Sequence, residues 1–561
     1  MRADSAAIGA DQRQSVAAFP RIAGLVPEQA WAHEQDLHGD DRLVAVVARV
    51  LGSLLQAPAF RHEIELLTDS SVVGCCTDQA ASDARKRAAT LAFHEGSFEH
   101  AAAQFTSALQ LADTSTADGQ KLEARLYANR AQCCLKLACP ESAVLDASCA
   151  IEADPLHTKA YYRRARALSA SGQAAAAAAD VHAALQNKAA APNDNEVKEL
   201  QALLQEIEGS AEVGEVASTR ADPTELMSAT EAVKLREESQ NGLGRYYAAR
   251  QDLLAGEKLL QDVPFDCVLR KRHRKTHCWT CIRPLPRFAP VPCRKSPLPF
   301  YCSFRCRSKD EKSHPRELGR PWAQILPEEA LLALRCALRC EGAEENPQGV
   351  NSADRSGNTE IAQILALENH LVEIEGRARK AMERTKDRAR HCDTCIGECT
   401  CLATWRDMVV LGCTAAACAH EHSRAWGRPS HREKMEKLAS NVVFFLARIQ
   451  ANGFAVVDSC TPAAVGGDSR TWRLGVALYA RASLLNHACC PNTHVSFEGS
   501  AVVVRATRRI ALGRLDVVCG LGGGPVLVWA LLRSLLDELS ICMLQLLCTL
   551  HLIKSSLRHV R

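Results

Sequence analysis

Six residues between positions 278 and 314 have the types and the spacing of zinc ligands. Zinc takes four tetrahedral nitrogen or sulfur ligands, and closely spaced cysteine pairs on tight turns can supply them. Two such pairs occur here, one with two intervening residues and one with three. The chemistry that these residues predict is therefore zinc coordination. The candidate ligands are Cys278, Cys281, Cys293, Cys302, Cys306 and His314.

The cysteine content favours metal binding over disulfides. The chain has 26 cysteines among 561 residues, and its first ten residues carry charges but no apolar run typical of a secretory signal. We therefore expect a reducing compartment, where clustered cysteines indicate zinc. A second group of cysteines and histidines, at residues 391–422, includes Cys413 and Cys418. We interpret this second group as surface thiols of a helical segment.

A second chemical motif lies at Gly475–Asn492, which reads GVALYARASLLNHACCPN. Together with the cysteine pattern, it resembles the cofactor segment of SET-domain lysine methyltransferases that carry a MYND zinc finger. The resemblance implies that Asn486 contacts S-adenosylmethionine through its amide and His487 mostly through its backbone. It also implies that Tyr479 lines the channel for the substrate lysine, although the pattern is equally compatible with a core aromatic residue.

An earlier stretch, Asn241–Ala249, resembles the start of the same domain. By this resemblance, Gly244 and Arg245 lie on the loop that meets the amino-acid end of the cofactor. Glycine there lets the backbone approach a ligand closely. Transfer of a methyl group to a lysine needs both reactants held close and aligned, and the amine must be neutral to attack. Tyr246 stands where the family usually has a glycine.

The same resemblance divides the zinc ligands into two sites. The second site would use Cys293, His314 and two further positions, which hold Ser296 and Leu318 in this chain. Neither is a zinc ligand of any strength. We therefore expect one zinc ion, with the second site weak or empty unless another residue substitutes. The first site is complete and consists of Cys278, Cys281, Cys302 and Cys306.

The chain departs from the family pattern after Gly513. Gly520 occupies the position of the family's catalytic tyrosine, and the later C-x-C-x-x-C element is absent. Loss of that hydroxyl should cost on the order of a hundredfold in rate. Two functions stay open: a protein-lysine methyltransferase, and a scaffold that binds partners through its repeats and finger. A third interpretation is that residues 514–561 are a misread end of an ordinary enzyme.

An internal repeat precedes these motifs. Asn129-Arg130-Ala131 recurs as Arg163-Arg164-Ala165, and Asp146 recurs as Asp180, both at an offset of 34 residues. This period resembles the tetratricopeptide repeat, a helix pair that buries its apolar face by stacking on its neighbour. A generic alanine-rich helical bundle is the alternative. Such an array is expected to bind a peptide or protein ligand.

A chain of this length is expected to form several domains. The pattern predicts a multidomain α+β protein, with an N-terminal α-solenoid before a SET β-core that is split by a MYND zinc finger and a helical insertion. The predicted parts are 1–83 (helical, unassigned), 84–208 (tetratricopeptide repeats), 209–230 (linker), 231–277 (first SET part), 278–318 (finger), 319–457 (helical insertion), 458–513 (SET core with the Asn-His motif) and 514–561 (divergent tail).

Charge and hydropathy limit the remaining partners. A formal net charge of +3 gives no strong signal for a polyanionic partner. The basic run Arg270–Lys275 could be a nuclear signal, a nucleic-acid contact or a solvated loop. Residues 525–553 are apolar but interrupted by charges, which favours an amphipathic helix over a membrane span. The resemblance implies histone or non-histone protein substrates, in nucleus and cytoplasm.

Overall fold

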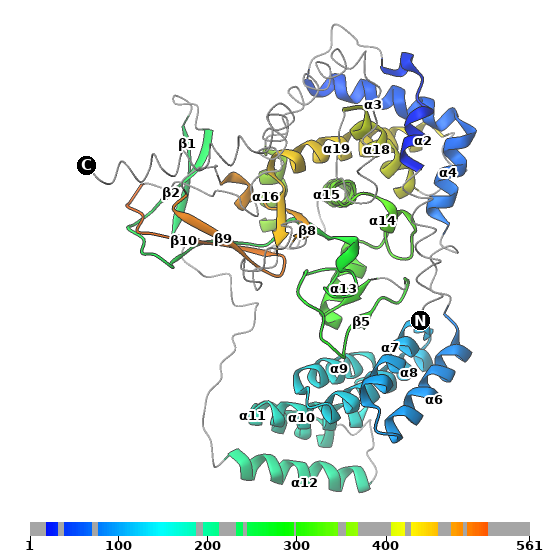
Figure 1. Ribbon diagram of the computed structural model, residues 1–561, viewed down its shortest axis with the longest axis vertical. Helices are drawn as coiled ribbons and strands as arrows, with labels where there is room; N and C mark the ends of the chain where they lie inside the picture. Colours follow the sequence, from blue (N-terminus) through cyan, green and yellow to red (C-terminus); the bar gives the residue numbers. More distant parts are fainter. Residues whose placement is uncertain are drawn as a thin grey trace, which may run out of the picture.

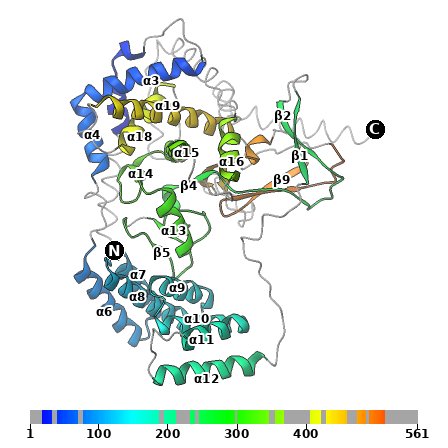
Figure 2. The same ribbon diagram turned by 180° about the vertical axis from the view of Figure 1, so that it is seen from behind.

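The computed structural model places a helical array at one end of the molecule, a small module in the middle, and a helical lobe and a strand lobe beyond it (Figures 1 and 2). Every structural statement below concerns the described residues. The structure describes residues 18–31, 39–69, 77–186, 194–211, 232–238, 244–296, 299–345, 355–367, 405–420, 428–457, 473–485 and 491–513. The predictions for residues 514–561 lie outside these ranges.

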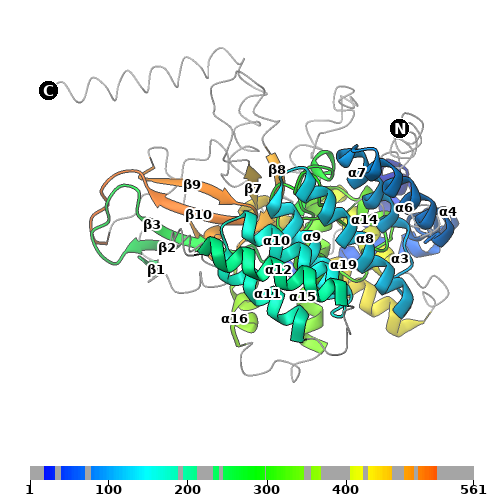
Figure 3. The same cartoon turned by 90° about the horizontal axis from the view of Figure 1, so that it is seen from below.

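Seven described helices between residues 79 and 211 form the array (Figure 3). Each helix packs on the next along the chain, and α8 also packs on α10. A residue with positive φ follows the first helix of each pair, at Gly96, Ala138 and Gly172. The 34-residue offset between Ala138 and Gly172 matches the predicted repeat. The helices are α6 (Gln79–His94), α7 (Phe98–Leu111), α8 (Ala117–Lys136), α9 (Pro140–Ala153), α10 (Thr158–Ala170), α11 (Ala174–Gln186) and α12 (Asp194–Ala211).

A buried ion pair recurs within successive repeats. Arg130 donates two hydrogen bonds to Asp146, at 2.8 and 2.7 Å, and both side chains are fully buried. Thirty-four residues later, Arg164 donates in the same way to Asp180, at 2.7 and 2.6 Å. A bidentate pair fixes the orientation of the two helices that carry it. This recurrence confirms the 34-residue period.

The described strands form small antiparallel sheets, in the orders β1-β2, β3-β10-β9, β4-β8-β7 and β5-β6. Asp262 lies opposite Val502, and Asp266 lies opposite Leu478. Chain segments before residue 270 therefore share sheets with segments after residue 472. The strands are β1 (Val233–Glu238), β2 (Gly244–Ala249), β3 (Lys258–Asp262), β4 (Asp266–Leu269), β5 (Val291–Pro292), β6 (Phe300–Tyr301), β7 (Phe454–Val457), β8 (Arg473–Leu478), β9 (Thr493–Glu498) and β10 (Ala501–Ala506).

The helical lobe joins the N-terminal helices, residues 18–68, to helices between residues 322 and 452. Helices α3 and α4, from the unassigned N-terminal region, pack against α18, and α3 also packs against α19. The interface buries Val47, Leu51 and Leu54 of α3. The lobe consists of α2 (Ala18–Gly24), η1 (Glu28–Trp31), α3 (Gly39–Gln56), α4 (Pro58–Thr68), α14 (Trp322–Ile325), α15 (Glu328–Glu345), α16 (Arg355–Leu365), α18 (Trp405–Ala419) and α19 (Pro429–Asn452).

One sequence interpretation needs correction in this lobe. Cys413 and Cys418 were expected at the surface, but both are fully buried in α18. The reason is that α18 is covered by α3, α4, α15 and α19. The rest of the 391–422 cluster, apart from His420, lies outside the described residues.

No single described helix is long and apolar enough to cross a membrane. Residues 40–56 and 58–68 reach that length and apolarity only when taken together, and an 89° bend separates them.

Candidate functional site

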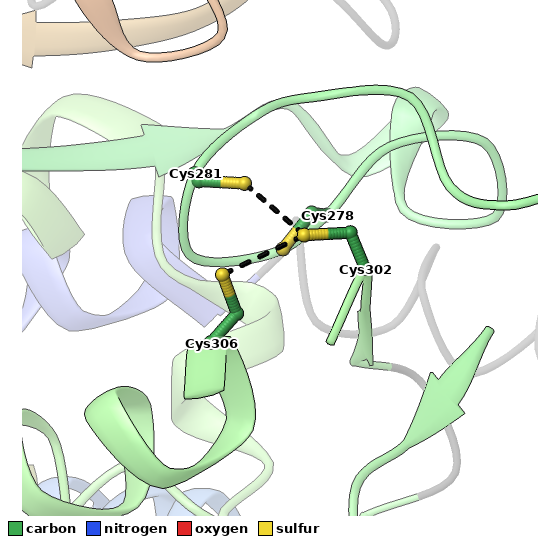
Figure 4. A group of neighbouring side chains, drawn as sticks. All are labelled: Cys278, Cys281, Cys302 and Cys306. Carbon is green, nitrogen blue, oxygen red and sulfur yellow. Dashed lines mark hydrogen bonds between the residues drawn. The ribbon is translucent and has the colours of Figure 1, made fainter. Parts of the chain in front are cut away.

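Four cysteine thiols converge in the finger, residues 278–318, beside the start of helix α13 (Phe304–Ser313) (Figure 4). Their sulfurs all lie within 4.8 Å of one another. The sulfur of Cys302 is 3.5 Å from that of Cys281 and 3.6 Å from that of Cys306. Tetrahedral zinc with Zn–S bonds of about 2.3 Å separates its sulfurs by roughly 3.8 Å. The cluster therefore fits a zinc ion, and no other group in the described part of the chain could hold a metal.

Local backbone geometry brings the two cysteine pairs together. Cys278 and Cys281 sit on a turn that closes at Ile282, which has a φ of 58° and donates its amide to the carbonyl of Cys278. Positive φ is unusual for a β-branched residue, and packing must hold it in place. Thr280 donates its hydroxyl to the carbonyl of Cys306 at 2.9 Å, which ties this turn to α13.

The thiols have strongly perturbed proton affinities. Burial, followed by hydrogen bonds from the other three thiols, raises the pKa of Cys278. Hydrogen bonds from the same group lower the pKa of Cys306. A zinc ion would replace these shared protons, because the thiolate is the ligand form. Four protein ligands leave no open position, so the metal's role here would be structural.

His314 lies between two carboxylates. Its Nδ1 is 2.8 Å from Asp310 Oδ1, and its Nε2 is 3.0 Å from Asp266 Oδ2. Burial and the nearby Arg335 disfavour the imidazolium, but Asp266 outweighs them and the pKa of His314 rises to about 9. Burial alone would raise the pKa of Asp266, and His314 with Arg335 lowers it to about 2. His314 is therefore a cation that links the finger to strand β4.

The other positions of the predicted second zinc site also have different partners. The buried Cys293 accepts a hydrogen bond from the amide of Lys295 at 3.4 Å. Ser296 accepts one from Gln324 Nε2 at 3.0 Å, and Leu318 is a buried apolar side chain. The cluster of four thiols includes neither Cys293 nor His314. The described residues therefore supply one set of zinc ligands.

The predicted cofactor residues fall partly within the described structure. Gly244 and Arg245 open strand β2, which contacts the short helix η6 (Ala482–Leu484). The structure thus brings β2 beside the segment that precedes Asn486 in the chain. Asn486 and His487 themselves lie outside the described residues. Arg245 donates from Nη2 to the carbonyl of Ala366, just after α16, at 2.5 Å.

Tyr479 is packed inside the strand lobe. Its hydroxyl donates to the carbonyl of Ser500 at 2.6 Å, and its ring meets Phe454 edge-to-face with centroids 5.3 Å apart. Burial raises the pKa of this hydroxyl well above its ordinary value. These contacts are compatible with a core aromatic residue, and the place of Tyr479 in a lysine channel stays a prediction.

The contacts of two residues near η6 and strand β8 were not predicted from the sequence. Asp262, at the end of β3, accepts hydrogen bonds from the backbone amides of Arg481 and Ala482, just where η6 begins. Gly475 lies where a Cβ would meet Val268 O at 2.5 Å, because strands β4 and β8 approach closely there. A single acidic residue at a strand end and a single glycine in a strand have many possible roles, so their partners become visible only in the fold.

The finger is joined to the repeats by buried charges. Glu123 of α8 lies 3.0 Å from Arg307 and 2.7 Å from Arg294 of the finger. Arg307 also donates to the Tyr127 hydroxyl at 3.0 Å, and Arg130 donates to the carbonyl of Pro290 at 3.0 Å. Glu123 and Arg307 are almost fully buried. The finger and the array therefore form a continuous unit.

Two side chains of the basic run at residues 270–275 have partners inside the molecule, whereas Arg272 and Lys275 are exposed. Lys271 donates from Nζ to the carbonyl of Ile325 at 2.8 Å. Arg274 is 5% exposed, and its Cζ lies 4.8 Å from the ring centroid of Trp279. These side chains are not available as a continuous cationic patch.

Comparisons with known proteins identify distant relatives. The chain is 25% identical over 273 residues to N-lysine methyltransferase SMYD2 of Gallus gallus, covering 48% of this chain and 50% of the relative. It is 22% identical over 279 residues to N-lysine methyltransferase SMYD2 of Homo sapiens, with 48% and 50% covered. The chain thus spans about half the length of these relatives. Its homologues are lysine methyltransferases, at low identity; no family model matches.

Solved structures of TPR domains match about a quarter of this chain. The first TPR of Spaghetti (RPAP3) bound to HSP90 peptide SRMEEVD is 22% identical, with a TM-score of 0.21, covering 24% of this chain and 98% of that one. The Arabidopsis OM64 TPR domain is 27% identical, with a TM-score of 0.20, covering 23% and 97%.

Proposed function

We propose that this protein is an S-adenosylmethionine-dependent protein-lysine N-methyltransferase. The observation that carries the proposal is the contact between β2, which begins with Gly244 and Arg245, and η6, which precedes Asn486. These two segments are the parts that the sequence predicts for one cofactor site. The homology to lysine methyltransferases supports the same reaction.

When bound, S-adenosylmethionine would supply the methyl group for in-line displacement by the lysine amine. The protein's part is to align the two reactants and to keep the amine unprotonated in a desolvated place. Gly244 allows the backbone of β2 to approach a ligand, and Asn486 would offer its amide to it. Zinc on the four thiols would hold the finger's fold, away from the reacting atoms.

The order of repeats, interrupted SET core and finger resembles that of SET and MYND domain-containing protein 4. We infer this identity for the chain. Its substrates would be lysines of histone or non-histone proteins, in nucleus and cytoplasm. The repeats would bind a peptide or protein ligand. A nucleic-acid partner is disfavoured, because Lys271 and Arg274 have internal contacts.

Titration of the full-length, zinc-loaded chain with S-adenosylmethionine tests the cofactor assignment. We expect saturable binding, and we expect Asn486→Ala to weaken it by about tenfold or more, since that variant removes the side-chain amide that the resemblance assigns to the cofactor contact. If Asn486→Ala binds S-adenosylmethionine as well as the wild type does, Asn486 does not belong to the cofactor site. Absence of binding by the wild type would contradict the proposed function.

A non-catalytic scaffold is the second candidate function. Two observations favour it: Gly520 stands at the expected catalytic tyrosine, and buried charges join the finger to the repeats. A scaffold would fold with one zinc ion, yet neither bind S-adenosylmethionine nor transfer a methyl group. The same titration, combined with metal analysis of the purified chain, therefore separates the two functions.

A further inference from the structure

Asp262 is a buried carboxylate at the end of strand β3, with 9% of its surface exposed. Its Oδ2 atom accepts hydrogen bonds from the backbone amides of Arg481, at 2.9 Å, and Ala482, at 2.8 Å. Amides at the start of a helical turn have no partner within the turn. Asp262 therefore caps η6 from a strand 219 residues earlier in the chain.

Helix η6 has a second anchor on its other side. Ser483 donates its hydroxyl to the carbonyl of Asn452, the last residue of α19, at 3.0 Å. Ala482 is fully buried between these two contacts. The path of the backbone through η6 is thus fixed by β3 and by α19, while η6 itself contacts β2.

A buried carboxylate is unfavourable at this place unless hydrogen bonds stabilise its charge. Burial raises the pKa of Asp262, which means that the surroundings disfavour its charge, and the amides of Ala482 and Arg481 oppose that effect. An apolar residue would fill the same space but leave two buried amides without an acceptor. Charge-assisted hydrogen bonds to backbone amides are stronger than neutral ones. Asp262 can therefore hold the backbone of η6 in one position.

We infer that Asp262 is a positioning residue of the proposed cofactor site: it holds η6 against strand β2, which carries Gly244 and Arg245. The inference rests on the proposed function, because it assigns Asp262 to the site that binds S-adenosylmethionine. Asp262 itself acts through η6.

The test compares Asp262→Ala with Asp262→Asn in the full-length, zinc-loaded chain, titrated with S-adenosylmethionine. Asp262→Ala should bind about tenfold or more weakly, because both amides lose their acceptor. Asp262→Asn keeps an acceptor oxygen and should stay within about threefold of the wild type. Asp252→Ala is the matched control: this exposed carboxylate also accepts from a backbone amide, that of Leu512 at 2.9 Å, but does not contact η6.

A second readout, hydrogen exchange at the amides of Arg481 and Ala482, separates this inference from the proposed function. Faster exchange confined to η6 in Asp262→Ala, restored in Asp262→Asn, is the expected result. If the wild type binds S-adenosylmethionine and Asp262→Ala binds it equally well, the inference is overturned. If the wild type does not bind, the proposed function fails, and unchanged exchange in Asp262→Ala would independently overturn the positioning role.

Should Asp262→Ala fail to fold, Ser483→Ala carries the same test from the other side of η6. It deletes the contact with Asn452 and should also lower the affinity for S-adenosylmethionine. Unchanged affinity in Ser483→Ala, although exchange at Ala482 becomes faster, would show that binding of S-adenosylmethionine does not depend on the position of η6 and would contradict the inference.

Discussion

Replacing Glu123 by leucine should release the finger from the repeat array. Glu123 is 2% exposed and pairs with Arg307, which is 1% exposed, and with Arg294, which is 29% exposed. Without Glu123, Arg294 can turn to solvent, but Arg307 stays buried with the Tyr127 hydroxyl and a carbonyl as hydrogen-bond acceptors, and its remaining ion pair is with the partly exposed Glu311, 4.0 Å from its Nε. Breaking a buried ion pair from one side costs about 3–5 kcal/mol, because a charge is left uncompensated.

The assay is hydrogen exchange on peptides that cover α8 and α13, since a chain of several lobes does not unfold in one step. A cost of about 3–5 kcal/mol corresponds to a fall in protection by roughly a hundredfold to several thousandfold. Arg287→Ala is the matched control at the same interface. Its pair with Glu99 is 3.7 Å long and exposed on both sides, so its loss should change little.

A double variant tests whether the two charges act on each other. Arg307→Leu removes the buried cation and leaves Glu123 with Arg294, so we expect it to cost less than Glu123→Leu. Combining both changes removes both buried charges, and the cost should be smaller than the sum of the single costs by about 1–3 kcal/mol. Exchange in Glu123→Leu that matches Arg287→Ala would refute the reasoning.

Three further predictions follow from single contacts. Metal analysis should find one zinc per chain. Cys306→Ser should lose this zinc and expose the buried Trp279 to solvent, because structural zinc stabilises the fold. The exposure would be measured as a red shift of the tryptophan fluorescence. His314 has a raised pKa, so its contribution to the free energy of unfolding, on the order of 3 kcal/mol, is fully present below pH 6.5 and lost as pH rises through about 9. Melting temperatures across that range should fall for the wild type and stay flatter for His314→Gln. Gly475→Ala should lower stability by about 1–3 kcal/mol, since its Cβ would meet Val268 O at 2.5 Å, whereas Gly209→Ala, with open space around it, should not destabilise in the same melting assay.

The local patterns in the sequence predicted local structure well. The 34-residue offset relates Arg130–Asp146 to Arg164–Asp180, and the structure pairs both. The spacing of the cysteines predicted zinc ligands, the resemblance to the MYND finger implied that these two pairs share one site, and their sulfurs do converge. In both cases the signal is periodicity or spacing within a few dozen residues.

Long-range partners could not be predicted from the same signals. His314 has the spacing of a zinc ligand, but its Nε2 atom is hydrogen-bonded to Asp266, 48 residues earlier in the chain. Glu123 and Arg307 lie in different parts of the chain, and a single charge on a helix usually indicates a solvated face. Asp262 and the packing of α3 on α19 are of the same kind, since each depends on which surfaces the fold brings together.

The most direct test of the central claim is methyl transfer itself. The full-length, zinc-loaded chain is incubated with methyl-labelled S-adenosylmethionine and, in separate reactions, with purified histones and with a total cellular protein extract, and lysine methylation is read by mass spectrometry. The proposed function predicts label on lysine side chains, lost in Asn486→Ala and retained in the exposed control Asp252→Ala. A correctly folded chain that carries one zinc and transfers no methyl group would contradict it and leave the scaffold function.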